Sequence, residues 1–182
     1  VLGCSNENTW GLMTSLKTSE DLGVARYETI QNNFSMLNTR FMDDLAFACR
    51  KEGVSLIPYS PLAGGVVSGK YLGGATPEGA RFSSLINAGG RFVEMTSRFV
   101  NQKSLTATEK VMAIAAEAGM SPVTLATAWS KQHDFVASTI VGVSREDQLA
   151  DIFAAIDLTL PDDVMKAVKN MMSDTNLRYT QG

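Results

Sequence analysis

An apolar run that gives way to small residues decides the fold of this chain. Val54-Ser-Leu-Ile57 leads directly into Pro58-Tyr-Ser-Pro-Leu-Ala-Gly-Gly-Val-Val-Ser-Gly-Lys-Tyr71. The apolar run predicts a buried strand over 54–58. The residues that follow place backbone N–H groups and little bulk at the C-terminal end of this strand, where α/β folds hold their ligands. We therefore expect a ligand site here, with Lys70 as a nearby cation.

Outward from this segment, predicted strands alternate with predicted helices. The strands are expected at 1–4, 26–31, 54–58 and 137–141, and the helices at about 8–22, 41–50, 106–118, 122–132, 145–155 and from 161 on. Expected helix caps are Asn6 or Asn8 for the first helix, Ser121 for the one at 122–132 and Ser144 for the one at 145–155. Such alternation favours an α/β fold with parallel strands.

Four strands are half of what a closed (β/α)8 TIM barrel needs, and such a barrel typically has about 250 residues. With 182 residues, the chain is expected to be one partial domain over 1–182. We interpret it as the C-terminal half of a barrel, with strands 5–8 and their helices. Its two open sheet edges would need an upstream half, a covering partner chain or a rearranged packing.

The region from Tyr59 to about Lys103 is expected to be a long irregular loop. It holds 8 of the 15 glycines of the chain. Loops of this length are uncommon in compact domains unless they are functional. The glycine content predicts a segment that is flexible or that approaches a ligand closely.

The composition excludes several classes of function. A net charge of −3 without a basic run argues against nucleic-acid binding, and no apolar stretch reaches the length of a membrane span. Cys4 and Cys49 are expected to be buried, reduced thiols, and the single histidine, His133, makes a histidine-ligated metal site improbable. We expect a cytoplasmic protein. Because Val1 lies inside a predicted strand, an organellar protein is the alternative if a leader was removed.

Polar side chains follow the first two predicted strands. Ser5 and Asn6 end the first, and Gln31 ends the second. Parallel strands open on the same mouth of a barrel, and hydroxyl and amide groups can hydrogen-bond a carboxamide there. The plainer alternative is that these residues are ordinary helix caps and loop residues.

Two further groups are candidates for ligand contacts. Tyr59 can stack on a flat ring, or it can simply cover the rim of the barrel core. After the fourth strand, Gly142 allows close backbone approach, and Ser144 offers a hydroxyl where a helix N-terminus favours an anion. Lys70 and Arg81, each taken alone, fit solvated surface charges equally well.

These segments together resemble the aldo-keto reductases. The resemblance rests on Gly3-Cys-Ser-Asn6, on Ile30-Gln-Asn-Asn-Phe-Ser-Met-Leu-Asn38, on the 57–71 segment and on Val141-Gly-Val-Ser-Arg-Glu-Asp-Gln-Leu149. It extends from residue 1 to about residue 160. The chain is most similar to the branch that includes bacterial-type reductases and potassium-channel β subunits.

The resemblance implies NADP(H) as the cofactor and assigns a role to each candidate. Contacts with the nicotinamide carboxamide are implied for Ser5, Asn6 and Gln31, and stacking on the nicotinamide for Tyr59. Contacts with the cofactor phosphates are implied for Ser60, Leu62, Gly64, Lys70 and Arg81, the last on the 2′-phosphate side. Contacts with the adenosine end are implied for Ser144, Gln148 and Asp151, with Arg145 as a further 2′-phosphate partner. Gly142 is expected to let the backbone approach the cofactor there. One position departs from the pattern, because Ile152 stands where many members carry an asparagine that bonds the adenine.

The resemblance also shows what this sequence lacks. Family members reduce carbonyl groups with an Asp, a Tyr, a Lys and a His from the first four strands, and none of these has a matching position here. His133 is expected to be a surface residue at the wrong end of the barrel. Two interpretations stay open: the cofactor-binding half of a reductase of aldehydes or ketones, and a catalytically inactive structural or regulatory subunit of a larger assembly.

Overall fold

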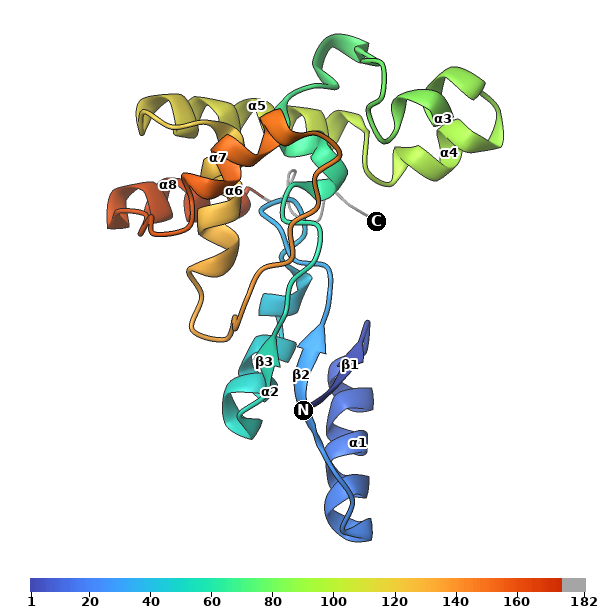
Figure 1. Ribbon diagram of the computed structural model, residues 1–182, viewed down its shortest axis with the longest axis vertical. Helices are drawn as coiled ribbons and strands as arrows, with labels where there is room; N and C mark the ends of the chain where they lie inside the picture. The colour runs from blue at the N-terminus through green and yellow to red at the C-terminus, as the bar shows by residue number, and fades with distance from the viewer. Residues whose placement is uncertain (175–182) are drawn as a thin grey trace.

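The computed structural model describes residues 1–174, which form an α/β fold (Figure 1). Its elements are β1 (Leu2–Ser5), α1 (Thr9–Leu22), β2 (Tyr27–Gln31), η1 (Arg40–Met42), α2 (Leu45–Glu52), β3 (Ser55–Leu56), η2 (Ala63–Ser68), η3 (Leu72–Gly74), α3 (Ser83–Ala88), α4 (Arg91–Ser97), α5 (Gln102–Glu117), α6 (Pro122–Lys131), η4 (Glu146–Gln148), α7 (Leu149–Phe153) and α8 (Asp162–Met172).

The sheet has three parallel strands in the order β1-β2-β3. Ser5 lies opposite Gln31, and Ile30 lies opposite Leu56. Three of the four predicted strands are thus confirmed, and their C-terminal ends are aligned at one edge of the sheet. The third is shorter than predicted, since it covers only Ser55–Leu56.

The predicted fourth strand at 137–141 is wrong as a regular strand. This segment contacts β3 through the single bridge between Leu56 and Val136. Leu56 donates its N–H to the carbonyl of Phe135 (2.7 Å), and Ala137 donates to the carbonyl of Leu56 (2.9 Å). Beyond the end of β3, Pro58 has no N–H to donate, although its carbonyl accepts the N–H of Ile140 (2.8 Å). An extended segment therefore lies along β3 without forming a full strand.

Local sequence signals explain most helix ends. The side chain of Asn8 caps α1, and Gly23 ends that helix with a φ of 62°. Ser121 caps α6, with Pro122 in its first turn. The helix α5 begins before the predicted residue 106, because Asn101 and Ser104 form a capping box.

The 59–103 region is not irregular throughout, as the sequence led us to expect. It contains η2, η3, α3 and α4, and Figure 1 shows α3 and α4 projecting from the rest of the molecule. All eight of its glycines have positive φ. The short helices escape sequence prediction because each spans only three to seven residues, and glycine interrupts the periodicity that would reveal them.

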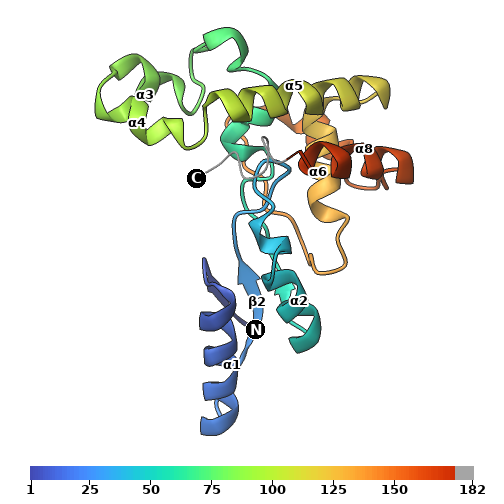
Figure 2. The same ribbon diagram turned by 180° about the vertical axis from the view of Figure 1, so that it is seen from behind.

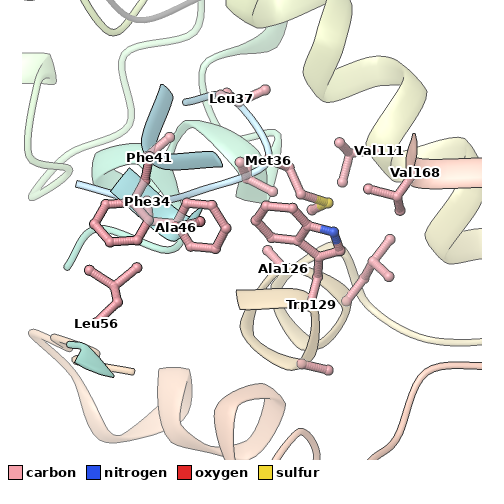
Figure 3. Close-up of a cluster of buried hydrophobic side chains, with 14 of the residues drawn as sticks. Phe34, Met36, Leu37, Phe41, Ala46, Leu56, Val111, Ala126, Trp129 and Val168 are labelled. Atoms are coloured by element: carbon pink, nitrogen blue, oxygen red, sulfur yellow. The ribbon is translucent and has the colours of Figure 1, made fainter. Parts of the chain in front are cut away.

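The core lies where the sheet meets the helices, and Figure 3 shows part of it. Phe34, from the segment after β2, stacks on Trp129 of α6 with ring centroids 4.9 Å apart. Both side chains are almost completely buried. Phe135 completes the cluster, with its ring 5.6 Å from that of Phe34. Aromatic pairs at this spacing add to the stabilisation from buried apolar area.

His133 packs against this aromatic cluster and is half-buried, so the prediction of a surface residue is only partly correct. Its ring stacks on Phe135 at 5.1 Å and lies edge-on to Trp129 at 4.7 Å. Its Nε2 is buried, with no hydrogen-bond partner among the described residues. Burial lowers the pKa of His133 to about 4.

The two thiols agree in part with expectation. Cys49 is buried and Cys4 is partly buried, and both are free. Burial raises the pKa of Cys49 to about 11, so this thiol is unreactive at neutral pH.

The end of the molecule that carries the sheet leaves apolar side chains uncovered. The views in Figures 1 and 2 show β1 and β2 with α1 extending away from the helices α5, α6 and α8. Val1, Leu2 and Trp10 are exposed beside β1, and Ile140 and Val143 are exposed beyond β3.

In residues 1–174 no single helix is long and apolar enough to cross a membrane, although α5 and α6, bent by 93°, pass that length and composition test as a pair.

Candidate functional site

The ends of the three strands bring Ser5, Asn6, Gln31 and Tyr59 together. Tyr59 Oη donates to Asn6 Oδ1 (2.8 Å), and Asn6 Nδ2 donates to Ser5 Oγ (3.0 Å). Ser5 Oγ donates in turn to the carbonyl of Gln31 (3.0 Å), which also accepts the N–H of Asn6 (3.0 Å). Three of the four side chains are thus connected, and no hydrogen bond of the Gln31 side chain to other described residues is present.

Strained backbone marks the same end of the sheet. Among residues 1–174, three residues other than glycine have positive φ: Asn6 (57°), Ser60 (57°) and Ala63 (52°). The left-handed region costs such residues about 1–2 kcal/mol each. All three follow the C-terminal ends of strands, where strain is often retained for function.

The glycine pair after β3 makes room for other groups. A Cβ on Gly64 would lie 2.7 Å from the ring of Phe82, and a Cβ on Gly65 would lie 2.7 Å from Lys70 Nζ. The loop therefore holds the Lys70 ammonium group directly against its backbone. Leu62 accepts the N–H groups of Gly65 and Val67 with its carbonyl, so its part in the loop is to fix the turn.

Positive charge gathers around this loop. The pKa of Lys70 is lowered, first by burial and then by the positive charge of Arg145. Arg145, in the 142–151 segment, therefore lies near enough to the loop after β3 to act on the charge of Lys70. Lys70 has no carboxylate partner in the described part of the chain. Arg81 is exposed, and its guanidinium lies 5.7 Å from the ring of Phe82.

The 142–151 segment is ordered by its own side chains. Gln148 Oε1 accepts the N–H of Ser144 (2.9 Å), and Arg145 forms a two-fold ion pair with Asp147 (2.8 and 2.9 Å). The prediction that Ser144 caps a helix over 145–155 is wrong, because η4 and the short α7 follow and Arg145 is at the cap position. Gly142 lies in open surroundings, so a side chain there would meet nothing within 4 Å.

Asp151, the last residue of this segment, and Ile152, which follows it, differ in exposure. Asp151 is exposed and its carbonyl accepts the hydroxyl of Thr124 (2.8 Å). Ile152 is 6% exposed. Its side chain therefore packs inward and presents no group to a ligand on the surface.

A hollow that sequence reasoning missed borders the strand-end residues. It has a volume of about 350 Å³ and is lined by Asn6, Asn32 and Asn33, among others. The amide oxygens of Asn32 and Asn33 are buried without a partner among the described residues. Their position directly after Gln31 was the available signal. A larger hollow, of about 550 Å³, lies around Leu16, Gly23 and Arg26, far from the strand ends.

The arrangement can hold a polar ring substituent and an anion, but it offers no acid–base pair. The amide and hydroxyl groups at the strand ends suit a carboxamide, and the cations around Lys70 suit a phosphate. Among residues 1–174 no group of three or more His, Cys, Asp or Glu residues is placed to hold a metal ion. His133 is half-buried against the aromatic core, and its low pKa keeps it neutral at physiological pH.

Comparison with known proteins identifies the family of the chain. The sequence model of the aldo/keto reductase family matches residues 1–172. The chain is 36% identical to the protein named "Protein tas" from Escherichia coli over 168 residues, which are 92% of this chain and 46% of that protein. It is 28% identical to an L-glyceraldehyde 3-phosphate reductase from Escherichia coli O157:H7, over 83% of this chain and 43% of that protein.

A third relative is named as a channel subunit and not as a reductase. The "Probable voltage-gated potassium channel subunit beta" from Arabidopsis thaliana is 35% identical over 58% of this chain and 31% of its own length. The chain spans about half the length, or less, of these curated relatives. With a family model that matches 172 of its 182 residues, the chain belongs to the aldo/keto reductase family.

Proposed function

We propose that this chain is the NADP(H)-binding, C-terminal half of an aldo-keto reductase that reduces aldehydes or ketones. The convergence of Ser5, Asn6, Gln31 and Tyr59 at three adjacent strand ends carries the proposal. Amide and hydroxyl groups in this arrangement suit the carboxamide of a nicotinamide ring.

The residues present fit this cofactor. Because Gly65 has no side chain, the Lys70 ammonium group lies directly against the loop backbone, where it is available to a pyrophosphate. Lys70 and Arg145 repel each other, and a phosphate between them would relieve that repulsion. Arg81 and Arg145 are available to a 2′-phosphate, although Arg145 would have to give up part of its pairing with Asp147.

In this proposal the chain binds and orients the cofactor. When bound, NADPH supplies a hydride to the carbonyl carbon of the substrate. Ser5, Asn6 and Gln31 fix the rotation of the nicotinamide, and Tyr59 covers one of its faces. The groups that protonate the product would come from the half of the barrel that also covers the exposed edge of β1.

The experiment is a test of aldehyde-dependent oxidation of NADPH by the natural polypeptide in its full length. Reduction of an aromatic or aliphatic aldehyde is expected, and Gln31→Ala is expected to raise the KM for NADPH. Gln102→Ala is the matched control, because it removes an exposed amide at the start of α5. Failure of the wild-type protein to bind NADPH would overturn the proposal.

The second candidate is a catalytically inactive subunit of a larger assembly. The name of the Arabidopsis thaliana relative favours it, as does the apolar surface left open beside β1. Saturable NADPH binding without turnover of any aldehyde or ketone would support this candidate. Turnover of a carbonyl compound would exclude it.

A further inference from the structure

The hydroxyl of Tyr59 terminates the chain of hydrogen bonds at the strand ends. Its contact with Asn6 Oδ1 is the shortest of that chain, at 2.8 Å. Stacking of the Tyr59 ring on a nicotinamide does not require this hydroxyl. The hydroxyl must therefore have another role or none.

The direction of each hydrogen bond in this series is fixed by the last acceptor, the carbonyl of Gln31. The carbonyl of Gln31 can only accept, so Ser5 Oγ donates its proton there. Ser5 Oγ then accepts from Asn6, so the NH₂ group of the Asn6 amide faces Ser5. The oxygen of the amide consequently faces Tyr59, whose hydroxyl donates to it. The network permits only one orientation of the Asn6 amide.

This orientation leaves a defined pair of groups for a ligand. An asparagine amide has two N–H donors and two oxygen lone pairs. Ser5 uses one donor and Tyr59 uses one lone pair. One donor and one acceptor remain on an exposed side chain, and this pair is complementary to a primary carboxamide.

The backbone of Asn6 adds to this constraint. Its φ of 57° lies in the left-handed region, and its N–H is bonded to the carbonyl of Gln31 at 3.0 Å. Both the main chain and the side chain of Asn6 are thus held before any ligand arrives. Preorganisation of this kind reduces the entropic cost of binding.

We propose that Tyr59 is a positioning residue whose hydroxyl locks the amide of Asn6 and so makes the site selective for a ring that carries a primary carboxamide. The inference rests on the proposed binding of NADP(H). It concerns the hydroxyl of Tyr59, which acts through Asn6, and not the stacking face of its ring.

The test compares NADPH with its 3-acetylpyridine analogue, which replaces the NH₂ of the carboxamide by a methyl group. Dissociation constants are measured by calorimetry on the full-length natural polypeptide and on Tyr59→Phe, which keeps the ring. Tyr59→Phe is expected to weaken NADPH binding by about two- to tenfold, as the loss of one hydrogen bond implies, and to change analogue binding by less than about twofold. The preference for NADPH therefore falls.

Two further variants separate this role from a structural one. Tyr27→Phe removes another hydroxyl of the same sheet that has no hydrogen-bond partner within residues 1–174, and it is expected to leave both affinities unchanged. In an Asn6→Ala background, Tyr59→Phe is expected to have no further effect on the preference, because the hydroxyl acts through Asn6.

Different results would overturn this inference and the proposed function. Equal weakening of both ligands by Tyr59→Phe, no effect on either, or a full effect in the Asn6→Ala background would overturn the role of the hydroxyl alone. No binding of NADPH by the wild-type protein would overturn the proposed function, and the inference with it.

Discussion

The aromatic core differs in exposure and in backbone strain from the strand-end surface, which is formed by Ser5, Asn6, Gln31, Tyr59 and Ser60. The core packs Phe34, Trp129 and Phe135 with almost no exposed area. The strand ends present exposed polar groups and hold Asn6 and Ser60 at positive φ. The core gains free energy from burial, whereas the strand ends lose some to strain. Stability and ligand binding therefore depend on different residues, and substitutions can separate them.

The largest expected effect belongs to the core. Trp129→Ala is expected to lower the free energy of unfolding by about 3–5 kcal/mol, because it leaves a cavity against Phe34. Urea unfolding followed by circular dichroism measures this change. Phe47→Ala, at a side chain that is 65% exposed, is expected to cost about 0.5 kcal/mol or less. Equal losses in the two variants would contradict the placement of the core.

The next effect is the dependence of core stability on pH. The folded pKa of His133, about 4, lies below its ordinary value of 6.5, so the unfolded chain binds the proton more tightly. Its contribution is complete above pH 6.5 and is lost as the pH falls toward 4, by roughly 3 kcal/mol. Unfolding free energies measured between pH 4 and 7 test this. The His133→Phe variant is expected to show a flatter profile, and an unchanged profile would show that His133 is not responsible.

Two glycines in the segment after β3 allow the effect of backbone strain on stability to be separated from the effect on ligand binding. Gly65→Ala and Gly73→Ala both place a side chain at positive φ, and each is expected to cost about 1 kcal/mol. Only Gly65→Ala would push against Lys70 Nζ. We expect it alone to weaken NADPH binding, by about tenfold. Equal affinities of the two variants, measured by titration, would argue against a phosphate contact of Lys70.

The smallest expected effect is a gain in stability at the strand ends. Ser60→Gly relieves the left-handed strain at a φ of 57°. After the entropic cost of glycine is subtracted, a gain of about 0.5 kcal/mol remains. Ser55→Gly, within β3, is expected instead to cost about 0.5–1 kcal/mol. Thermal unfolding of both variants distinguishes the two signs, and destabilisation by Ser60→Gly would remove the argument from strain.

The sequence predicts regular elements better than it predicts exceptions. The apolar run before Pro58 and the caps at Asn8 and Ser121 identify elements that the structure contains. The strand at 137–141 fails because its pairing depends on the neighbouring segment, where Pro58 follows β3 and has no N–H to donate. No pattern within 137–141 itself predicts this loss of a hydrogen-bond donor in another segment.

The candidate site also contains some features that the sequence predicts and others that it does not. Ser5, Gln31 and Tyr59 could be placed at strand ends from their order in the sequence alone. The repulsion between Lys70 and Arg145, which are 75 positions apart in the chain, could not. The partial burial of His133 escaped prediction too, because it depends in part on the ring of Phe34, which is about 100 positions away in the chain.

The most direct test of the central claim is calorimetric titration of the full-length natural polypeptide with NADPH and with NADH. We predict one saturable site per chain, tighter binding of NADPH than of NADH, and a weaker preference in the Lys70→Met variant. Absence of saturable binding, or equal affinity for both cofactors in the wild-type protein and the variant, would contradict a strand-end surface built for NADP(H).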